Sequence, residues 1–478
     1  MSVKARDAFQ EFWRLNVSKV GVFFLAILVI LSIYVITSYP LDFGVRYWNN
    51  PSYWADYPKS APPSWINYFS DQKLPEHYVF SSDKPSNVLP TETGKVLLYT
   101  FKLYFQADKP PTFLSFALEN VTYYSKPLTV KLDVKRPDEK TIELYRYVVP
   151  APYLNESSPY RRFYDQPKRI SITGDMTVAS TLARFLLREY NVSMKPSEVN
   201  SVGQHTIIFS IPNQNKQFNV LKGEYVFTLS IEAYDNRDYV GRVKLVVGGD
   251  VYGFMGTDSL GRDLSIGLLF GFPIALFIGV VTSTITTLFG AGLGIVSGYI
   301  GGRLDEVIQR AADFVNNIPL LPLLIFLAFI LGQNIWVLVF LLVAFGWPTL
   351  TIVVRSMVLQ LKSGQFIEAA ISLGAPRWWI MFKHIFPQVA PFIFAQLIFF
   401  TPTFILLEAA LSFLGLGDPT IPTWGQILEY GFRSGGIYVG LWWWIIPPGL
   451  LIIWTAVTFV LIALGMEPVV NPRLRRMR

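Results

Sequence analysis

The sequence predicts an α-helical membrane protein with six transmembrane helices and an additional, mainly β, sandwich-like domain. The first observation is compositional: 51% of the 478 residues are hydrophobic and only 16% are charged, whereas about 25% of the residues of a soluble protein are charged. The second is that the apolar residues are gathered in long runs without charge. The third is that residues 40–250 interrupt this pattern with short alternating segments, which are typical of strands.

Charge-free runs define the expected spans. Residues 20–38 can cross the membrane once, because about 20 helical residues span the hydrocarbon core. A cleaved signal peptide is the alternative, but the run is long for one and no small-x-small cleavage site follows it. The other spans are expected in residues 264–302, 314–354 (two helices joined near Gly332), 385–407 and 434–466. Since one central charge costs about 2.5–3.5 kcal/mol, such runs indicate six membrane helices.

Basic residues in the short connecting segments predict the orientation. If the N-terminus is cytoplasmic, the inner segments hold Lys4, Arg6, Arg14, Lys19, Arg303, Arg310, Arg355, Lys362, Arg377, Lys383, Arg473, Arg475, Arg476 and Arg478. The two short outer loops hold only Arg433. We therefore expect a multi-pass protein of the plasma membrane with both termini in the cytoplasm and residues 40–262 outside the cell.

Four glycines recur at every fourth position of one predicted span: Gly290, Gly294, Gly298 and Gly302. On a helix they form a ridge that lets a neighbouring backbone approach closely. The ridge predicts a packing surface for another helix, which either moves or stays fixed.

The region after the first span predicts an antiparallel β-sandwich. Alternating runs bounded by Pro, Gly, Asn and Asp predict strands at residues 95–105, 128–134, 141–149, 205–211 and 225–234. Apolar residues with helical spacing predict one helix near residues 177–190. We expect this domain to be a scaffold that packs against other subunits or the cell envelope; direct capture of substrate, or docking of a solute-binding protein, is the alternative.

Three N-x-S/T triplets at Asn120, Asn155 and Asn191 are candidate glycosylation sites, although such triplets also arise by chance. No catalytic set and no metal site are expected. The sequence has no cysteine, and its three histidines lack zinc-type spacing. Nucleic-acid binding is not expected, because the sequence contains no cluster of basic residues with interleaved aromatic residues.

Residues 355–386 form a charged, turn-containing segment between two predicted spans. Helical spacing predicts a short helix from residue 365 to 373, with Glu368 in its first turn, where the helix dipole favours a carboxylate. Gly374 can take the left-handed conformation that ends a helix, and Pro376 prevents continuation. The small residues Ala369 and Ala370 suit insertion into a groove of a partner. The chain has no Walker A motif, so energy would have to arrive through such a surface.

This segment resembles the EAA loop of ABC-importer permeases. Glu368, Ala369, Ala370, Gly374 and Pro387 match the pattern E-A-A-x3-G-x9-I-x-L-P, with histidine and phenylalanine in place of its isoleucine and leucine. Three further stretches are similar to the C-type permease subunits of dipeptide/oligopeptide/nickel importers: GTDSLGRD (256–263), LSFLGLGDPTIPTWG (411–425) and LGMEPVVNPRLR (464–475). The sequence departs from that family at Gly267 and Pro273, where arginines would be expected, and in the size of the segment after the first helix.

The resemblance implies a type I importer permease core in residues 256–478, preceded by a first helix in residues 1–39 and a β-rich domain in residues 40–255. It implies that the ATPase-docking helix presents Glu368, Ala369, Ala370, Leu373, Gly374 and Pro387. It places at the outer mouth, near the translocation path, Asp258, Arg262, Asp263, Glu408, Gly415, Gly417 and Trp424. For the three charged residues of the first stretch the alternative is a salt-bridged cap, and for Glu408 it is a structural hydrogen bond.

The resemblance further implies the pore-forming subunit of an ATP-driven importer, with di- and oligopeptides as the expected cargo. The implied partners are a sister permease, two ABC ATPases that bind ATP and Mg²⁺, an extracytoplasmic solute-binding protein and membrane lipid; this chain itself would bind no cofactor and would not be an enzyme. Oligosaccharides or other solutes are the alternative cargo. A membrane receptor or sensor, and a membrane enzyme with an outer catalytic domain, are the alternatives of another class.

Overall fold

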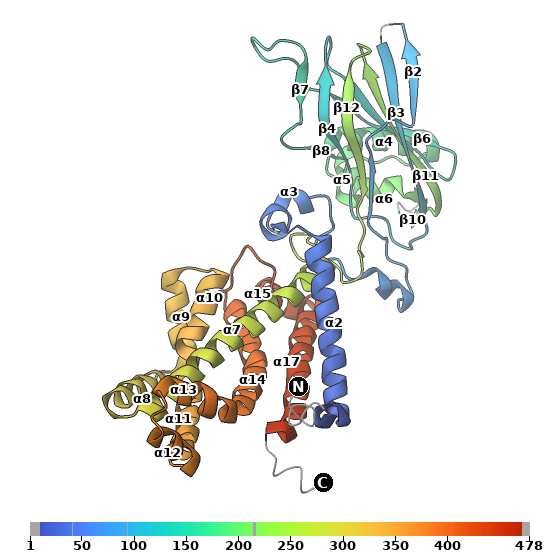
Figure 1. Cartoon of the computed structure of the whole chain (residues 1–478). Helices are drawn as coiled ribbons and strands as arrows, with labels where there is room; N and C mark the ends of the chain where they lie inside the picture. Colours follow the sequence, from blue (N-terminus) through green and yellow to red (C-terminus); the bar gives the residue numbers. More distant parts are fainter. Residues whose placement is uncertain (1–9, 41, 93, 214–216, 471–478) are drawn as a thin grey trace. The chain divides into compact units, whose positions relative to one another are not determined.

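The computed structural model describes residues 10–40, 42–92, 94–213 and 217–470, and it divides the chain into two compact units. One unit holds the residues up to Tyr53 and those from Leu264 onward, and the other is Trp54–Asp263 (Figure 1). The first boundary, between Tyr53 and Trp54, comes later in the chain than the boundary after residue 39 that the sequence suggested. The reason is local packing: Gly44 lies against Thr420 and Trp48 against Gly267, so this stretch belongs with the helices.

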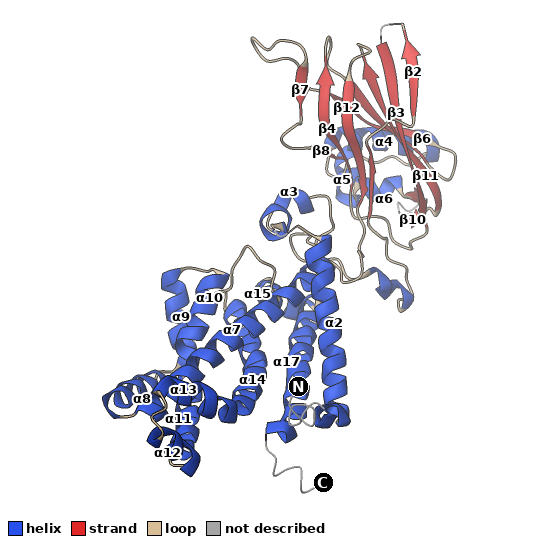
Figure 2. Cartoon of the chain, viewed as in Figure 1, coloured by secondary structure: helices blue, strands red, loops and turns tan. Residues whose placement is uncertain are grey.

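The first unit consists of helices (Figure 2). They are α2 (Asn16–Ser38), the π-helix η1 (Gly44–Trp48), α3 (Pro51–Trp54), α7 (Leu264–Ile300), α8 (Gly302–Asn316), α9 (Leu320–Leu331), α10 (Ile335–Gly346), α11 (Pro348–Lys362), α12 (Gln365–Ser372), α13 (Arg377–Ile380), the π-helix η3 (Met381–Ile385), α14 (Phe386–Phe413), α15 (Trp424–Arg433), α16 (Gly436–Val439) and α17 (Trp442–Val470). Five helical stretches of the described chain are long and apolar enough to cross a membrane, and the bent pair α8–α9 makes a sixth candidate. The predicted multi-pass helical fold with a β-rich domain is confirmed.

Three of the four ridge glycines pack α7 against α11 within this chain. A Cβ at Gly290, Gly294 or Gly298 would lie only 2.7–2.9 Å from a main-chain carbonyl oxygen of α11 or its N-cap. Thr351 Oγ1 donates across the contact to the Gly290 carbonyl oxygen at 2.8 Å. The absence of side chains therefore brings the two backbones together, as small residues do in membrane helix pairs.

Gly302 does not belong to this ridge. Helix α7 ends at Ile300, and Gly302 begins α8 with φ +62° and no atom within 4 Å of its Cβ position. The repeat of four thus ends one turn earlier than the sequence suggested, because the chain turns before that residue.

The second unit is a sandwich of two antiparallel five-stranded sheets. Its strands are β1 (Tyr78–Ser82), β2 (Asn87–Thr91), β3 (Gly94–Phe105), β4 (Leu114–Tyr123), β5 (Thr129–Lys135), β6 (Thr141–Val148), β7 (Tyr160–Arg162), β8 (Lys168–Ser171), β9 (Ser210–Pro212), β10 (Phe218–Val220), β11 (Gly223–Ala233) and β12 (Tyr239–Val247). One sheet has the order β1-β12-β4-β7, with β8 also on β4, and the other has the order β2-β3-β11-β5-β6. Side chains from both sheets meet in one buried core. Residues 64–68 form a 3-10 helix, η2 (Ser64–Tyr68).

Three helices complete this unit: α4 (Met176–Tyr190), α5 (Pro196–Val202) and α6 (Gln204–Ile208). Helix α4 lies where the spacing predicts it, and the Asp175 side chain caps it by accepting from the N–H groups of Thr177 and Val178. The strand predicted at residues 205–211 is wrong for most of its length, since α6 comes first and only the short β9 follows. Ile207, Ile208 and Phe209 are all fully buried, so the two-residue alternation of a half-buried strand does not apply there.

The three candidate glycosylation asparagines share one backbone feature. Asn120, Asn155 and Asn191 have φ of +54°, +66° and +56°, and all are exposed. Asparagine adopts this left-handed region more readily than most residues, so the backbone conformation alone accounts for asparagine at these positions. Glycosylation at these positions stays a prediction.

Candidate functional site

Helix α12 and the turn after it make up the centre of the segment between α11 and α14. The helix ends in a Schellman motif: Ala375 N–H donates to the Ala370 carbonyl at 3.1 Å, and Gly374 N–H donates to the Ile371 carbonyl at 2.9 Å. Gly374 has φ +80°, with no atom within 4 Å of its Cβ position. Pro376 then caps α13. The local sequence thus dictates a short helix with a sharp end.

The two faces of α12 differ in burial. Ile367 and Ala370 are buried in the helical core, with 2% and 9% exposure. Ala370 therefore does not lie on a docking face as predicted, because it fills the contact between α12 and its own chain. Glu368, Ala369, Gly374 and Pro387 are exposed. The exposed side also carries Phe366 at 65% and Leu373 at 88% exposure.

His384 connects α12 to the start of α14. Its ring makes edge contacts with Phe366 at 4.8 Å and with Trp379 at 4.5 Å between centroids. These ring contacts join α12 to α13 and η3. The sequence motif marks His384 but does not reveal this contact, since Phe366 lies 18 positions earlier in the chain.

An ion pair that the sequence reasoning missed ties α8 to α11. Asp305 accepts from Arg355 through Nε and Nη2, both at 2.6 Å, and also from Ser297 Oγ. Lys362 Nζ donates to the Tyr299 carbonyl at 2.7 Å, which fixes the end of α11 to the end of α7. The only sequence signal was that Asp305 and Arg355 both flank predicted spans.

Comparison with known proteins places this arrangement in a family. The family described as binding-protein-dependent transport system inner membrane component matches residues 290–476. The oligopeptide transport system permease protein OppC of Bacillus subtilis (strain 168) is 34% identical over 224 residues, which is 47% of this chain and 72% of OppC. The chain belongs to this permease family.

Two further relatives extend the match. The dipeptide transport system permease protein DppC of Lactococcus lactis subsp. cremoris is 28% identical over 316 residues, 66% of this chain and 89% of that protein. The glutathione transport system permease protein GsiD of Pectobacterium atrosepticum is 32% identical over 249 residues, 51% of this chain and 80% of that protein. As a permease, the chain is a membrane subunit of an ABC importer complex and not an enzyme.

At the other end of α14, the permease folds residues 414–423 back against its own helices. Glu408 is 5% exposed and accepts from Ser412 Oγ at 2.7 Å, so the structure shows the hydrogen bond that was the alternative to a substrate contact. Gly415 turns with φ +79°, and a Cβ at Gly417 would lie 2.3 Å from Ser412 Oγ. Trp424 donates from Nε1 to the Leu268 carbonyl at 2.8 Å and is buried.

The departure from the family at Gly267 has a packing explanation. A Cβ at Gly267 would lie 2.4 Å from the indole of Trp48, and a Cβ at Gly271 would lie 2.0 Å from the indole of Trp424. Two tryptophans thus occupy the space beside this turn of α7. An arginine at position 267 would collide with Trp48, which explains why the usual residue is absent.

In the β unit, the segment GTDSLGRD folds into a tight turn. Asp258 and Arg262 are 0% and 3% exposed and form an ion pair with each other. The Asp258 carboxylate also accepts from the N–H groups of Leu260 and Arg262 at 2.9 Å. Asp263 closes the turn by a bridge with Thr257. These bonds describe the salt-bridged cap that was the alternative to a role in the outer mouth.

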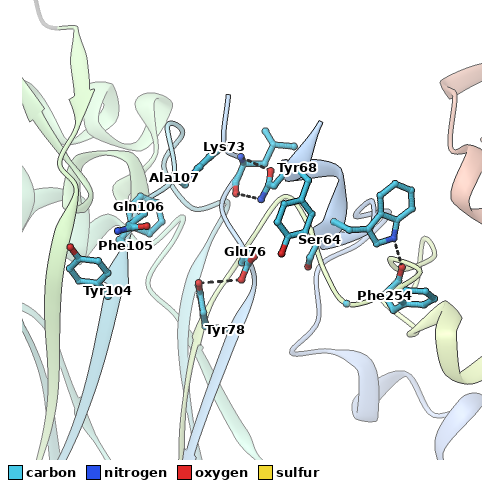
Figure 3. A pocket seen from close by; sticks show the side chains of 14 residues that line it. Ser64, Tyr68, Lys73, Glu76, Tyr78, Tyr104, Phe105, Gln106, Ala107 and Phe254 are labelled. Atoms are coloured by element: carbon cyan, nitrogen blue, oxygen red, sulfur yellow. Dashed lines mark hydrogen bonds between the residues drawn. The ribbon is translucent and has the colours of Figure 1, made fainter. Parts of the chain in front are cut away.

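The β unit also contains a cavity of about 660 Å³ between the segment before β1, the end of β3 and the segment after β12 (Figure 3). Its rim carries Tyr68, Tyr104 and Phe254, which are 87%, 67% and 69% exposed. Lys73 and Glu76 add one charge of each sign. Such a lining suits a ligand with apolar and polar parts. Sequence reasoning missed it because its residues come from opposite ends of the domain.

One half-buried histidine of this unit, His77, has a lowered pKa. Burial lowers the pKa of His77 to about 4, against the weaker opposing effect of Asp56. Its ring lies 5.7–6.0 Å from those of Tyr57, Phe113 and Tyr252. Nδ1 accepts from Gly249 N–H at 3.4 Å, a contact that only the ring unprotonated at Nδ1 can make.

Proposed function

We propose that this chain forms half of the pore of an ATP-driven importer of di- and oligopeptides. The relatives OppC, DppC and GsiD carry the names of oligopeptide, dipeptide and glutathione systems, and this supports a peptide cargo over oligosaccharides. The proposed assembly contains a sister permease, two ATPase subunits that bind ATP and Mg²⁺, and an extracytoplasmic solute-binding protein.

The observation that carries the proposal is the exposed apolar side of α12. Phe366 and Leu373 are 65% and 88% exposed, on a helix whose Ile367 and Ala370 are buried in its own chain. Large exposed apolar side chains of this kind mark a contact with another protein. In this mechanism the closing ATPases displace α12, and the displacement reaches α14 through Phe366 and His384.

In this mechanism, a displacement of α12 also reaches α7 through the contact between α11 and the glycine ridge. Helix α11 leads directly into α12 and packs backbone to backbone on α7. A shift of α11 therefore carries α7 with it, since packed helices move as bodies rather than deform. The combined shifts of α7, α11 and α14 would change the pore from inward-facing to outward-facing.

The orientation follows from the same proposal. Helix α12 faces the cytoplasm, where the ATPases are, both termini lie on that side, and the β unit lies outside the cell. The basic ends Lys4, Arg6, Arg473, Arg475, Arg476 and Arg478, part of the basis for this orientation, fall outside the described residues. The aromatic cavity favours capture of a ligand by the β unit over a purely structural role.

Reconstitution tests the proposal directly. The chain would be placed in proteoliposomes with its sister permease, its ATPases and its binding protein, and ATP-dependent uptake of labelled tripeptides and of maltotriose would be measured. We expect peptide uptake that requires ATP. Uptake of the sugar alone would refute the peptide assignment, and uptake without ATPases would refute the coupling role of α12.

A further inference from the structure

Helix α8 has an unusual environment for a helix between two membrane spans. Of its 15 residues only Ala312 is buried. It precedes α9 at an angle of 87°. Because an α-helix has 3.6 residues per turn, the side chains of α8 fall into three stripes of different character.

The first stripe contacts the rest of the protein. It consists of Asp305, Gln309, Ala312 and Asn316, which follow one another at four, three and four residues. Asp305 pairs with Arg355, Gln309 Nε2 donates to Ser297 Oγ at 3.0 Å, and Asn316 Oδ1 accepts from Thr349 Oγ1 at 3.2 Å. This stripe fixes the rotation of α8 about its own axis.

The second stripe is apolar and exposed. It consists of Leu304, Val307, Ala311 and Phe314, with the half-buried Ile308 and Val315 beside them. Leu304, Val307 and Phe314 are 43%, 65% and 70% exposed. An apolar stripe of this length is costly in water, so something must cover it.

The third stripe is charged. It consists of Arg303, Glu306, Arg310 and Asp313, two residues of each sign, and Arg310 pairs with Glu306 one turn away. Its formal charges cancel. This stripe suits contact with water, and it offers no excess positive charge for anionic lipid.

We propose that α8 lies flat in the surface of the bilayer, with its apolar stripe among the upper acyl chain segments and its charged stripe in water. The 87° bend supports this, because it prevents α8 and α9 from forming one straight span. Helix α9 is apolar throughout and suits the bilayer interior, and a helix at a right angle to one that enters the bilayer runs along the membrane surface. Helix α9 itself exposes Phe326, Phe329 and Ile330, so the apolar surface continues from the span into the stripe. Helices of this kind enter about 5–10 Å into the boundary between headgroups and acyl chains.

The position has a mechanical consequence. Asp305 holds α11 to α8 by two hydrogen bonds, and α11 leads into α12. The bilayer surface thereby restrains the helix that precedes the proposed docking helix. Since the charged stripe is neutral overall, this anchoring depends on apolar contact and not on the headgroup charge.

Because the chain has no cysteine, single spin labels test the proposal cleanly. Adjacent positions form matched pairs: Val307→Cys against Glu306→Cys, and Phe314→Cys against Asp313→Cys. The full chain would be placed in nanodiscs of neutral lipid and in nanodiscs with added phosphatidylglycerol, alone and in the assembled importer. Power saturation then gives the accessibility of each label to oxygen, which concentrates in the bilayer, and to a water-soluble nickel chelate.

We expect a severalfold higher oxygen-to-nickel ratio at positions 307 and 314 than at 306 and 313, equal in both lipid compositions and unchanged on assembly. Equal ratios within each pair would mean that α8 lies in water and would overturn the proposal. Labels at 307 and 314 that neither reagent reaches would show that a protein surface covers the stripe, and this would overturn it too. A difference that appears only with anionic lipid would contradict the role assigned to the apolar stripe.

Discussion

The two ends of α14 are built in opposite ways. Near its start, α12 leaves Phe366 and Leu373 exposed, and no atom approaches the Cβ position of Gly374. Beyond its end, residues 414–423 are folded against α7 and α14, and the side chains of Glu408 and Trp424 are buried and hydrogen-bonded. We call the first the exposed end, because apolar side chains are left uncovered there. We call the second the complete end, because the chain itself covers the side chains there. In the proposed mechanism, the end near α12 receives force from the ATPases and the other end holds the shape of the pore.

The largest expected effect comes from Gly374→Leu at the exposed end. A non-glycine residue at φ +80° costs about 1–3 kcal/mol, so the end of α12 would shift and uptake should fall by roughly tenfold or more. The matched control is Gly440→Leu, because Gly440 has the same φ of +80° and equally open surroundings in a different loop. ATP-dependent uptake and thermal stability would be measured for both. Equal losses of uptake would mean that backbone strain alone, and not α12, is responsible.

A substitution that disturbs the packing at the complete end should lower the thermal stability of the protein. In Gly271→Leu the new side chain would collide with the indole of Trp424, whose Nε1 lies 2.0 Å from the Cβ position, and overpacking of this kind costs about 1–3 kcal/mol. Gly292→Leu is the control, since no atom lies within 4 Å of the Cβ position of Gly292 on the same helix. Thermal unfolding in detergent should show a lower midpoint for Gly271→Leu alone. A normal midpoint would contradict the tight packing described for this end.

A pH-dependent effect on stability is expected in the β unit. The pKa of His77 falls from 6.5 to about 4 on folding, so below pH 6.5 the unfolded state binds more protons than the folded state. The free energy of unfolding of this unit should therefore fall by about 2.5 kcal/mol between pH 6.5 and pH 4. Above about pH 7.5 the histidine is neutral in both states and adds almost no pH dependence.

Urea unfolding of the full chain, followed by pulse proteolysis of the β unit at pH 7 and pH 4.5, measures this change. His77→Phe removes the titrating group and should flatten the difference between the two pH values. An unchanged pH dependence in this variant would assign the effect to other groups.

Sequence patterns predicted the elements whose conformation depends only on neighbouring residues in the chain. The long apolar runs gave the spans, and Gly374 with Pro376 gave the end of α12, because helix termination depends only on adjacent residues. Helix α4, which Asp175 caps, was also predicted locally, from the helical spacing of its apolar residues. The glycine ridge was also visible, but its partner α11 lies about sixty positions away and could not be named from spacing.

Contacts between distant residues could not be predicted. Ala370 matched the motif, but only the fold shows that it faces its own core. The pairing of Asp305 with Arg355, and the rings of Phe366 and Trp379 around His384, depend on how α8, α11 and α13 pack. The strand expected at residues 205–211 failed because burial on all sides removes the alternation that identifies a strand.

Thiol accessibility on the two faces of α12 tests the central claim most directly. Leu373→Cys and Ala370→Cys would each introduce one thiol into a chain that has none, and labelling with a membrane-impermeant maleimide would be followed in permeabilised membranes with and without the ATPase subunits. The account predicts that Leu373→Cys is labelled in the free permease and protected when the ATPases bind, while Ala370→Cys is not labelled in either state. Labelling of Leu373→Cys that is unchanged by bound ATPases would contradict the assignment of α12 as the docking surface.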